Sequence, residues 1–127
     1  MEISATLRTI LEIGFGVLYL IGGIFNAVYT FRNGEQFYGS FADNAWFAPA
    51  KWFIRKFVIP NPRIFTITLI LFQLMVAILL LSQGPFVTLG LLAGTAFSLY
   101  GVFVSNFQGA VVNLGLALMQ FYLASSK

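Results

Sequence analysis

The strongest constraint on the fold is a pair of uncharged apolar runs separated by a three-residue breaker. The runs cover residues 64–82 and 86–103, and neither contains Lys, Arg, Asp or Glu. A helix crosses the hydrocarbon core of a bilayer in about 20 residues, so each run is long enough to do so. The breaker, Gln83-Gly84-Pro85, leaves room only for a tight reversal. We therefore predict an antiparallel transmembrane hairpin.

Two further apolar segments complete a predicted bundle. They cover about residues 10–31 and about residues 110–123. Only 9% of the 127 residues are charged, whereas soluble domains have about 25%. So little charge cannot solvate a globular surface, and lipid is the expected solvent. The predicted fold is an all-α membrane protein with one domain, residues 1–127, built as an antiparallel bundle of four transmembrane helices.

The one long connection, residues 32–63, is predicted to contain a short interfacial helix. Within residues 45–58, Pro49 suits a first helical turn and the apolar residues follow helical spacing. Residues 32–44 look like turns, since they hold Asn-Gly and Gly-Ser pairs. Tryptophan prefers the headgroup level and cations face the lipid phosphates. The predicted membrane-surface patch therefore comprises Trp46, Lys51, Trp52, Arg55 and Lys56. The alternative is a docking site for a partner protein.

The distribution of cations predicts the orientation. The connection holds five, and the opposite side holds Arg8 and Lys127; the five are Arg32, Lys51, Arg55, Lys56 and Arg63. Cytoplasmic loops are enriched in Lys and Arg, so we expect a cell-membrane protein with residues 32–63 in the cytoplasm and both termini outside. A net charge of +3 would also suit a nucleic-acid partner. Because the cations gather beside apolar helices, they indicate a lipid surface instead, and no nucleic-acid partner is expected.

Polar residues inside the predicted spans are the candidate site, because such groups are costly in lipid. They are Glu12, Asn26, Gln73, Asn113 and Gln120. Their depth along the spans puts Asn26 level with Asn113 and Glu12 level with Gln120, so we expect the first and last spans to meet at these pairs. Arg8, four residues before Glu12, is placed to pair with it on one helix face.

Three interpretations of these residues stay open. The simplest is that they are hydrogen-bonding contacts between helices. The second is that Glu12, Gln73 and Gln120 line a cavity for a small polar headgroup or a quinone. The third is a proton or ion pathway. The chain has no histidine and no cysteine, which removes the usual ligands of haem and zinc. We therefore predict no cofactor, no metal site and no catalytic residue.

Two further patterns concern packing. Gly90, Gly94 and Ser98 form a small-residue stripe at helical spacing, which is typical of a helix-contact face within a bundle. The phenylalanines are expected mostly to face lipid. Alternatively, five in the long connection form a lid over the mouth of the bundle: Phe37, Phe41, Phe47, Phe53 and Phe57.

Several segments resemble a known family over most of residues 8–105. They are GFGVLYLIGGIFN (14–26), FYGSFAD (37–43), VIPNP (58–62), and FQ (72–73) followed by LLLSQG (79–84) and LGL (89–91). In these glycine and apolar patterns the chain resembles the DoxX-like family of small four-helix bacterial and archaeal membrane proteins. The family often has a glutamate where Gln73 stands here. The resemblance implies an accessory or partner-binding subunit of a membrane oxidoreductase assembly, and it identifies no catalytic residue.

Three functions therefore follow as hypotheses. The first is a non-catalytic integral membrane protein that acts as an accessory subunit of a membrane oxidoreductase-type assembly. The second is a lipid- or quinone-binding membrane protein with a pocket inside the bundle. The third is a small transporter or channel, which would need to be an oligomer. The expected partners are the lipid bilayer, a membrane protein or a second copy of the chain, and a lipid or quinone.

Overall fold

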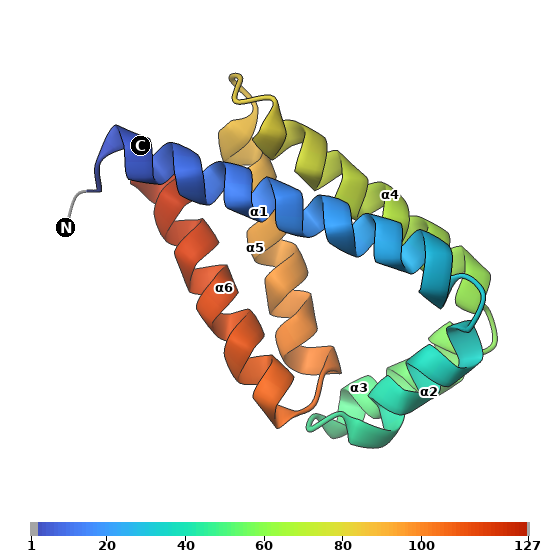
Figure 1. Cartoon of the computed structure of the whole chain (residues 1–127). Helices are drawn as coiled ribbons and strands as arrows, with labels where there is room; N and C mark the ends of the chain where they lie inside the picture. Colours follow the sequence, from blue (N-terminus) through green and yellow to red (C-terminus); the bar gives the residue numbers. More distant parts are fainter. Residues whose placement is uncertain (1–2, 127) are drawn as a thin grey trace.

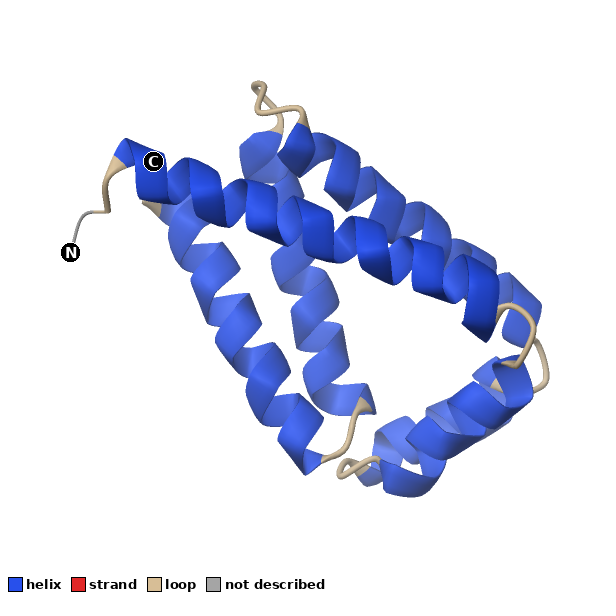
Figure 2. Cartoon of the chain, viewed as in Figure 1, coloured by secondary structure: helices blue, strands red, loops and turns tan. Residues whose placement is uncertain are grey.

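The computed structural model describes residues 3–126, and nearly all of them are helical (Figure 2). The helices are α1 (Ala5–Phe25), continued by the π-helical segment η1 (Asn26–Thr30), α2 (Gly34–Asn44), α3 (Ala48–Phe53), continued by the π-helical segment η2 (Ile54–Val58), α4 (Pro62–Leu81), α5 (Val87–Val104) and α6 (Phe107–Ser125). Four of them, α1 with η1, α4, α5 and α6, are long and apolar enough to cross a membrane. The predicted all-α fold with four spans is confirmed.

The four long helices form two antiparallel pairs. Helix α1 packs along α4, and α5 packs along α6, with α4 and α5 joining the pairs. The pairs meet at the end of the molecule that carries both termini and diverge toward the other end (Figure 1). There α2 and α3 lie across the opening. The bundle is therefore closed at the terminal end and splayed at the end formed by the long connection.

Helix caps make the first and last spans longer than predicted. The Ser4 hydroxyl accepts a hydrogen bond from the Leu7 backbone N–H at 3.1 Å, so α1 begins at Ala5 and not near residue 10. The Asn106 side chain accepts from the Gly109 N–H at 2.7 Å, so α6 begins at Phe107 and not near residue 110. Both boundaries depend on polar residues outside the apolar runs, which a hydropathy pattern does not detect.

The hairpin between α4 and α5 turns as predicted. Gln83 has a φ of 52°, a left-handed conformation that ends α4 abruptly. Its side-chain amide donates to the Leu80 carbonyl at 2.7 Å, which binds one of the free carbonyls at the end of the helix. The predicted bounds, residues 64–82 and 86–103, differ from those of α4 and α5 by at most two residues.

The expectation of turns in residues 32–44 is wrong, because residues 34–44 form α2. Tyr38 and Ala42, one helical turn apart, are buried in a cluster with Ile54 and Val58. This burial stabilises a helix that two glycines would otherwise weaken. The interfacial helix is present as α3 and η2, but it begins at Ala48, since Phe47 is extended (φ −103°, ψ 110°).

Two hydrophobic clusters hold the molecule together. The larger joins all four long helices toward the terminal end, and its members include Phe15, Tyr19, Leu80, Leu91 and Leu123. The smaller joins α2 to η2 and includes Tyr38 and Ile54. Since the helix pairs diverge between these clusters, the space between them is only partly filled by side chains.

Candidate ligand-binding cavity

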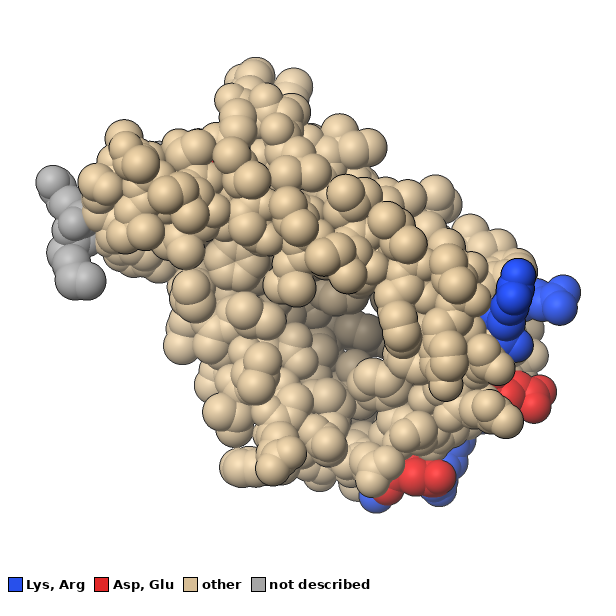
Figure 3. All heavy atoms as spheres, viewed as in Figure 1, with Lys and Arg blue, Asp and Glu red and all other residues tan. Residues whose placement is uncertain are grey.

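A cavity of about 270 Å³ lies between the two helix pairs, above the layer formed by α2 and η2. Figure 3 shows the surface hollowed between α1, α6 and α2. Most of the wall is apolar, and six of the sixteen lining residues are aromatic: Phe25, Phe37, Tyr38, Phe41, Phe97 and Tyr100. The remaining polar groups are Asn26, Gln73, Ser105 and Asn113. No charged residue of the described chain lines the cavity.

Three side chains are joined by hydrogen bonds beside the cavity, and two of them, Asn26 and Gln73, line it. The Thr30 hydroxyl donates to Asn26 Oδ1 at 2.7 Å, and Asn26 Nδ2 donates to Gln73 Oε1 at 2.5 Å. All three residues are buried. The oxygen of the Gln73 amide is therefore occupied, while its nitrogen donates no hydrogen bond to the described residues.

The backbone of α1 accommodates these hydrogen bonds between side chains. Asn26 and Thr30 lie at the two ends of η1, where α1 widens into a π-helix, a feature frequent at functional sites. A Cβ at Gly22 would lie 2.6 Å from Gln73 Nε2. Glycine at this position is thus what lets the amide of α4 approach α1.

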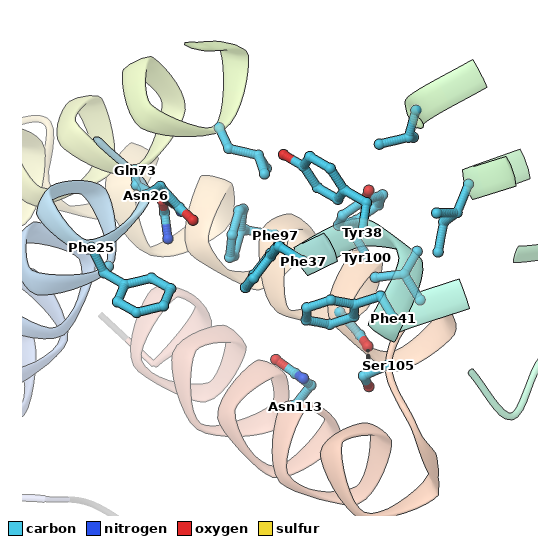
Figure 4. Close-up of a pocket in the computed structure, with 16 residues that line it drawn as sticks. Phe25, Asn26, Phe37, Tyr38, Phe41, Gln73, Phe97, Tyr100, Ser105 and Asn113 are labelled. Carbon is cyan, nitrogen blue, oxygen red and sulfur yellow. Dashed lines mark hydrogen bonds between the residues drawn. The ribbon is translucent and has the colours of Figure 1, made fainter. Parts of the chain in front are cut away.

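Asn113 reaches inward from α6, across the cavity from Asn26 and Gln73 (Figure 4). Its Nδ2 donates to the Gly109 carbonyl at 2.8 Å, one turn earlier in the same helix, and its Oδ1 accepts no hydrogen bond from the described residues. The predicted pairing of Asn26 with Asn113 is therefore wrong, although both residues face one cavity. The real partner of Asn26 is Gln73, on the helix that packs along α1.

A second polar network lies in the closed part of the bundle. The Tyr19 hydroxyl is 2.9 Å from the Gly94 carbonyl and 2.8 Å from Gln120 Oε1. Gln120 Nε2 in turn donates to the Ser98 hydroxyl at 2.9 Å. These groups join α1, α5 and α6 and do not line the cavity. For Gln120, the interpretation as a contact between helices agrees with the structure.

Glu12 lies at the terminal end, away from the cavity lining. It is 3% exposed, and its carboxylate is 3.9 Å from the Arg8 guanidinium, as the spacing predicted. Arg8 also donates to the Leu123 carbonyl at 2.6 Å and to the Ser126 hydroxyl at 2.5 Å. These bonds tie the start of α1 to the end of α6. Of the three residues predicted to line a cavity together, only Gln73 does so.

Tyr38 is a cavity residue that sequence reasoning missed. Thr66 Oγ1 lies 2.8 Å from the Tyr38 hydroxyl and also donates to the Pro62 carbonyl at 2.7 Å. Since a hydroxyl has one hydrogen, Tyr38 is the donor to Thr66. Burial raises the pKa of Tyr38, so the phenol stays neutral at physiological pH. The helical spacing of Phe37, Tyr38 and Phe41 is the signal that would have placed them on one face.

The proposed lid of phenylalanines forms only in part. Phe37 and Phe41 line the cavity. Phe53 instead lines a neighbouring groove of about 310 Å³ beside α4 and α5, which shares Leu69, Phe97 and Tyr100 with the cavity wall. Phe47 packs on Trp46 and Phe103, and Phe57 is 43% exposed against Trp52.

The predicted membrane-surface patch divides into two parts. Trp46 docks onto the end of α5, because its indole donates to the Val102 carbonyl at 2.6 Å. Trp52 is 58% exposed, with the Lys56 ammonium 4.9 Å from its ring centroid. Arg55 forms an exposed ion pair with Asp43 at 2.8 Å, and Lys51 is half-buried. In Figure 3 the visible charged side chains gather at the end that holds α2 and α3.

The fold and the site together define a class of molecule: a four-helix protein able to span a membrane, with an uncharged cavity at its splayed end. Comparison with models of known families finds no match, and neither the curated proteins nor the solved structures contain a match to this chain.

Proposed function

We propose that the chain is an integral membrane protein that binds an uncharged amphiphile, of the lipid or quinone class, in the cavity between its helix pairs. The observation that supports this most strongly is the lining itself. Aromatic and aliphatic side chains form most of the walls, and two amides on opposite sides each have an atom that can bond a ligand. Apolar walls with a few oriented polar groups are typical of small-molecule sites.

The chemistry of the lining restricts the ligand to neutral molecules. An ion moved from water into this space would lose its hydration and find no opposite charge in the lining. A neutral head that accepts or donates hydrogen bonds finds partners in Gln73 and Asn113. Anionic phospholipid headgroups are therefore disfavoured.

The size of the cavity suggests that only the head of the ligand is enclosed. Sites for whole drug-sized ligands have about 300–1,000 Å³, and this cavity has about 270 Å³. The hollow between α1 and α6 faces the side on which lipid would lie (Figure 3). A tail attached to the head would leave the protein there.

Native mass spectrometry of the protein, extracted gently from its own membranes, tests this proposal. We expect a discrete added mass on the wild-type chain. Leu69 lies on the cavity wall. The Leu69→Trp variant should lose the added mass, because the indole fills the cavity. Leu71, on the same helix, is 64% exposed, so Leu71→Trp is the matched control and should retain it. A bare wild-type chain, or equal retention by both variants, would contradict the proposal.

A second candidate function is the accessory subunit of a membrane oxidoreductase assembly, with residues 32–63 on the cytoplasmic side of the cell membrane. The resemblance to DoxX-like proteins supports it, and so does the lining of the cavity. The amides, hydroxyls and aromatic rings of the lining can bind a redox-active molecule but cannot themselves transfer electrons to it. A partner protein would therefore have to carry out the electron transfer. The same mass spectra report a stoichiometric larger complex if the chain has such a partner.

A further inference from the structure

We propose that the cavity distinguishes the oxidation states of a quinone-type head and binds the hydroquinone more tightly than the quinone. This inference rests on the proposed binding function and goes further, because it assigns a hydrogen-bonding direction to each side of the site. The direction follows from the internal bonds of two amides, Gln73 on α4 and Asn113 on α6.

The Gln73 side of the cavity is a donor. The hydroxyl of Thr30 can give its hydrogen to Asn26 Oδ1, which directs Asn26 Nδ2 toward Gln73 Oε1. This relay uses the oxygen of Gln73, and its nitrogen remains as the group available to a ligand. Gln73 is 7% exposed, so its amide has little access to other partners. Thr30 and Asn26 are thus positioning residues for this donor.

The Asn113 side of the cavity is an acceptor. Asn113 Nδ2 is held by the carbonyl of Gly109 at 2.8 Å, and a Cβ at Gly101 would lie 2.7 Å from Asn113 Oδ1. The amide is thus packed closely against α5 while it is bonded within α6. Oδ1 is then the atom of this amide with no hydrogen bond to the described residues. The second hydrogen on Nδ2 can be accepted by either oxidation state of a ligand, so Oδ1 is the atom that discriminates between them.

The two sides respond differently to the oxidation state of a ligand. A quinone carbonyl only accepts hydrogen bonds, whereas a hydroquinone hydroxyl both accepts and donates. Either form accepts from Gln73 Nε2, but only the hydroquinone donates to Asn113 Oδ1. With a quinone, two acceptor oxygens face each other, and the bound ligand would cover the Asn113 oxygen without giving it a hydrogen bond, which is unfavourable.

The test compares a decyl-substituted benzoquinone with its hydroquinone, reduced beforehand and kept free of oxygen. Calorimetric titration of the wild-type protein in micelles gives both affinities, after correction for partition into protein-free micelles. We expect the hydroquinone to bind about tenfold more tightly, the factor for one hydrogen bond of ordinary strength. For a two-electron couple, this factor corresponds to a rise of about 30 mV in the midpoint potential of the bound probe.

Variants separate the two sides of the site. Asn113→Leu should lower hydroquinone affinity to that of the quinone. Asn44→Leu is the matched control, because Asn44 also donates to a carbonyl four residues earlier, Ser40, at 2.8 Å, but lies outside the cavity. Gln73→Leu removes the donor and should weaken both probes by a similar factor. Equal wild-type affinities, or tighter quinone binding, would overturn the inference and leave the binding proposal standing. Failure of both probes to bind the cavity would overturn both.

Discussion

At the scale of single residues, two buried glutamines have different roles although their sequence contexts look alike. Gln120 uses both ends of its amide within the bundle, with Tyr19 and Ser98 as partners. Gln73 uses only its oxygen, so its nitrogen is available at the cavity. Depth along the predicted spans assigned each of these residues only a level in the bundle. It gave no direction around the helix axis, and for that reason it paired Asn26 with Asn113 in place of Gln73.

The network around Gln120 depends on glycine at position 94. A Cβ there would lie 2.0 Å from Gln120 Oε1 and 2.8 Å from the Tyr19 hydroxyl. Gly94→Ala should therefore destabilise the fold by about 1–3 kcal/mol, the usual cost of overpacking. The loss of stability can be measured by heating each variant in detergent and monitoring the fraction of protein that remains monodisperse. Gly115→Ala on α6 is the control, because nothing lies within 4 Å of its added methyl group. Equal melting temperatures for the two variants would argue against this packing.

At the scale of elements, the four spans and the helix in the second half of the connection were predictable, whereas helix α2 in its first half was not. Helices α4 and α5 are long, carry no charge apart from Arg63 in the first turn of α4, and are separated by a breaker, so their bounds follow closely from hydropathy and turn chemistry. Helix α2 contains Gly34 and Gly39 and has little local preference for a helix. It forms because Tyr38 and Ala42 bury themselves against η2, a contact between segments that local patterns do not reveal.

The two glycines of α2 provide a test of this explanation. No atom lies within 4 Å of a Cβ built at Gly39, whereas one at Gly34 would lie 2.7 Å from Pro62 Cβ. Gly39→Ala should stabilise the protein by up to about 1 kcal/mol, as expected for a glycine inside a helix. Gly34→Ala should destabilise it by steric contact. If Gly39→Ala lowered the melting temperature instead, residues 34–44 would not be helical in the membrane-extracted protein.

At the scale of the whole molecule, the closed and splayed ends have different chemistry. Arg8 ties α1 to α6 at the closed end. The splayed end carries α2, α3 and most of the cations, which are the basis of the predicted orientation. Lys127, one of the two cations counted on the opposite side, lies outside the described residues.

Cysteine labelling tests the orientation, since the chain has no cysteine of its own. Gln36 is exposed on α2, and Ser125 is exposed at the end of α6. With residues 32–63 in the cytoplasm, an impermeant maleimide added to intact cells should label Ser125→Cys and leave Gln36→Cys unlabelled until the cells are opened. The reverse pattern would invert the topology without changing the fold.

The one-sided position of the cavity has a consequence for where a ligand would come from. The cavity lies on the side of α2 and η2, while the opposite half of the bundle is filled by the larger hydrophobic cluster and the Tyr19–Gln120 network. A molecule that enters between α1 and α6 would therefore arrive from a single leaflet. In a bilayer whose two leaflets differ in composition, the protein would bind molecules from one leaflet and not from the other.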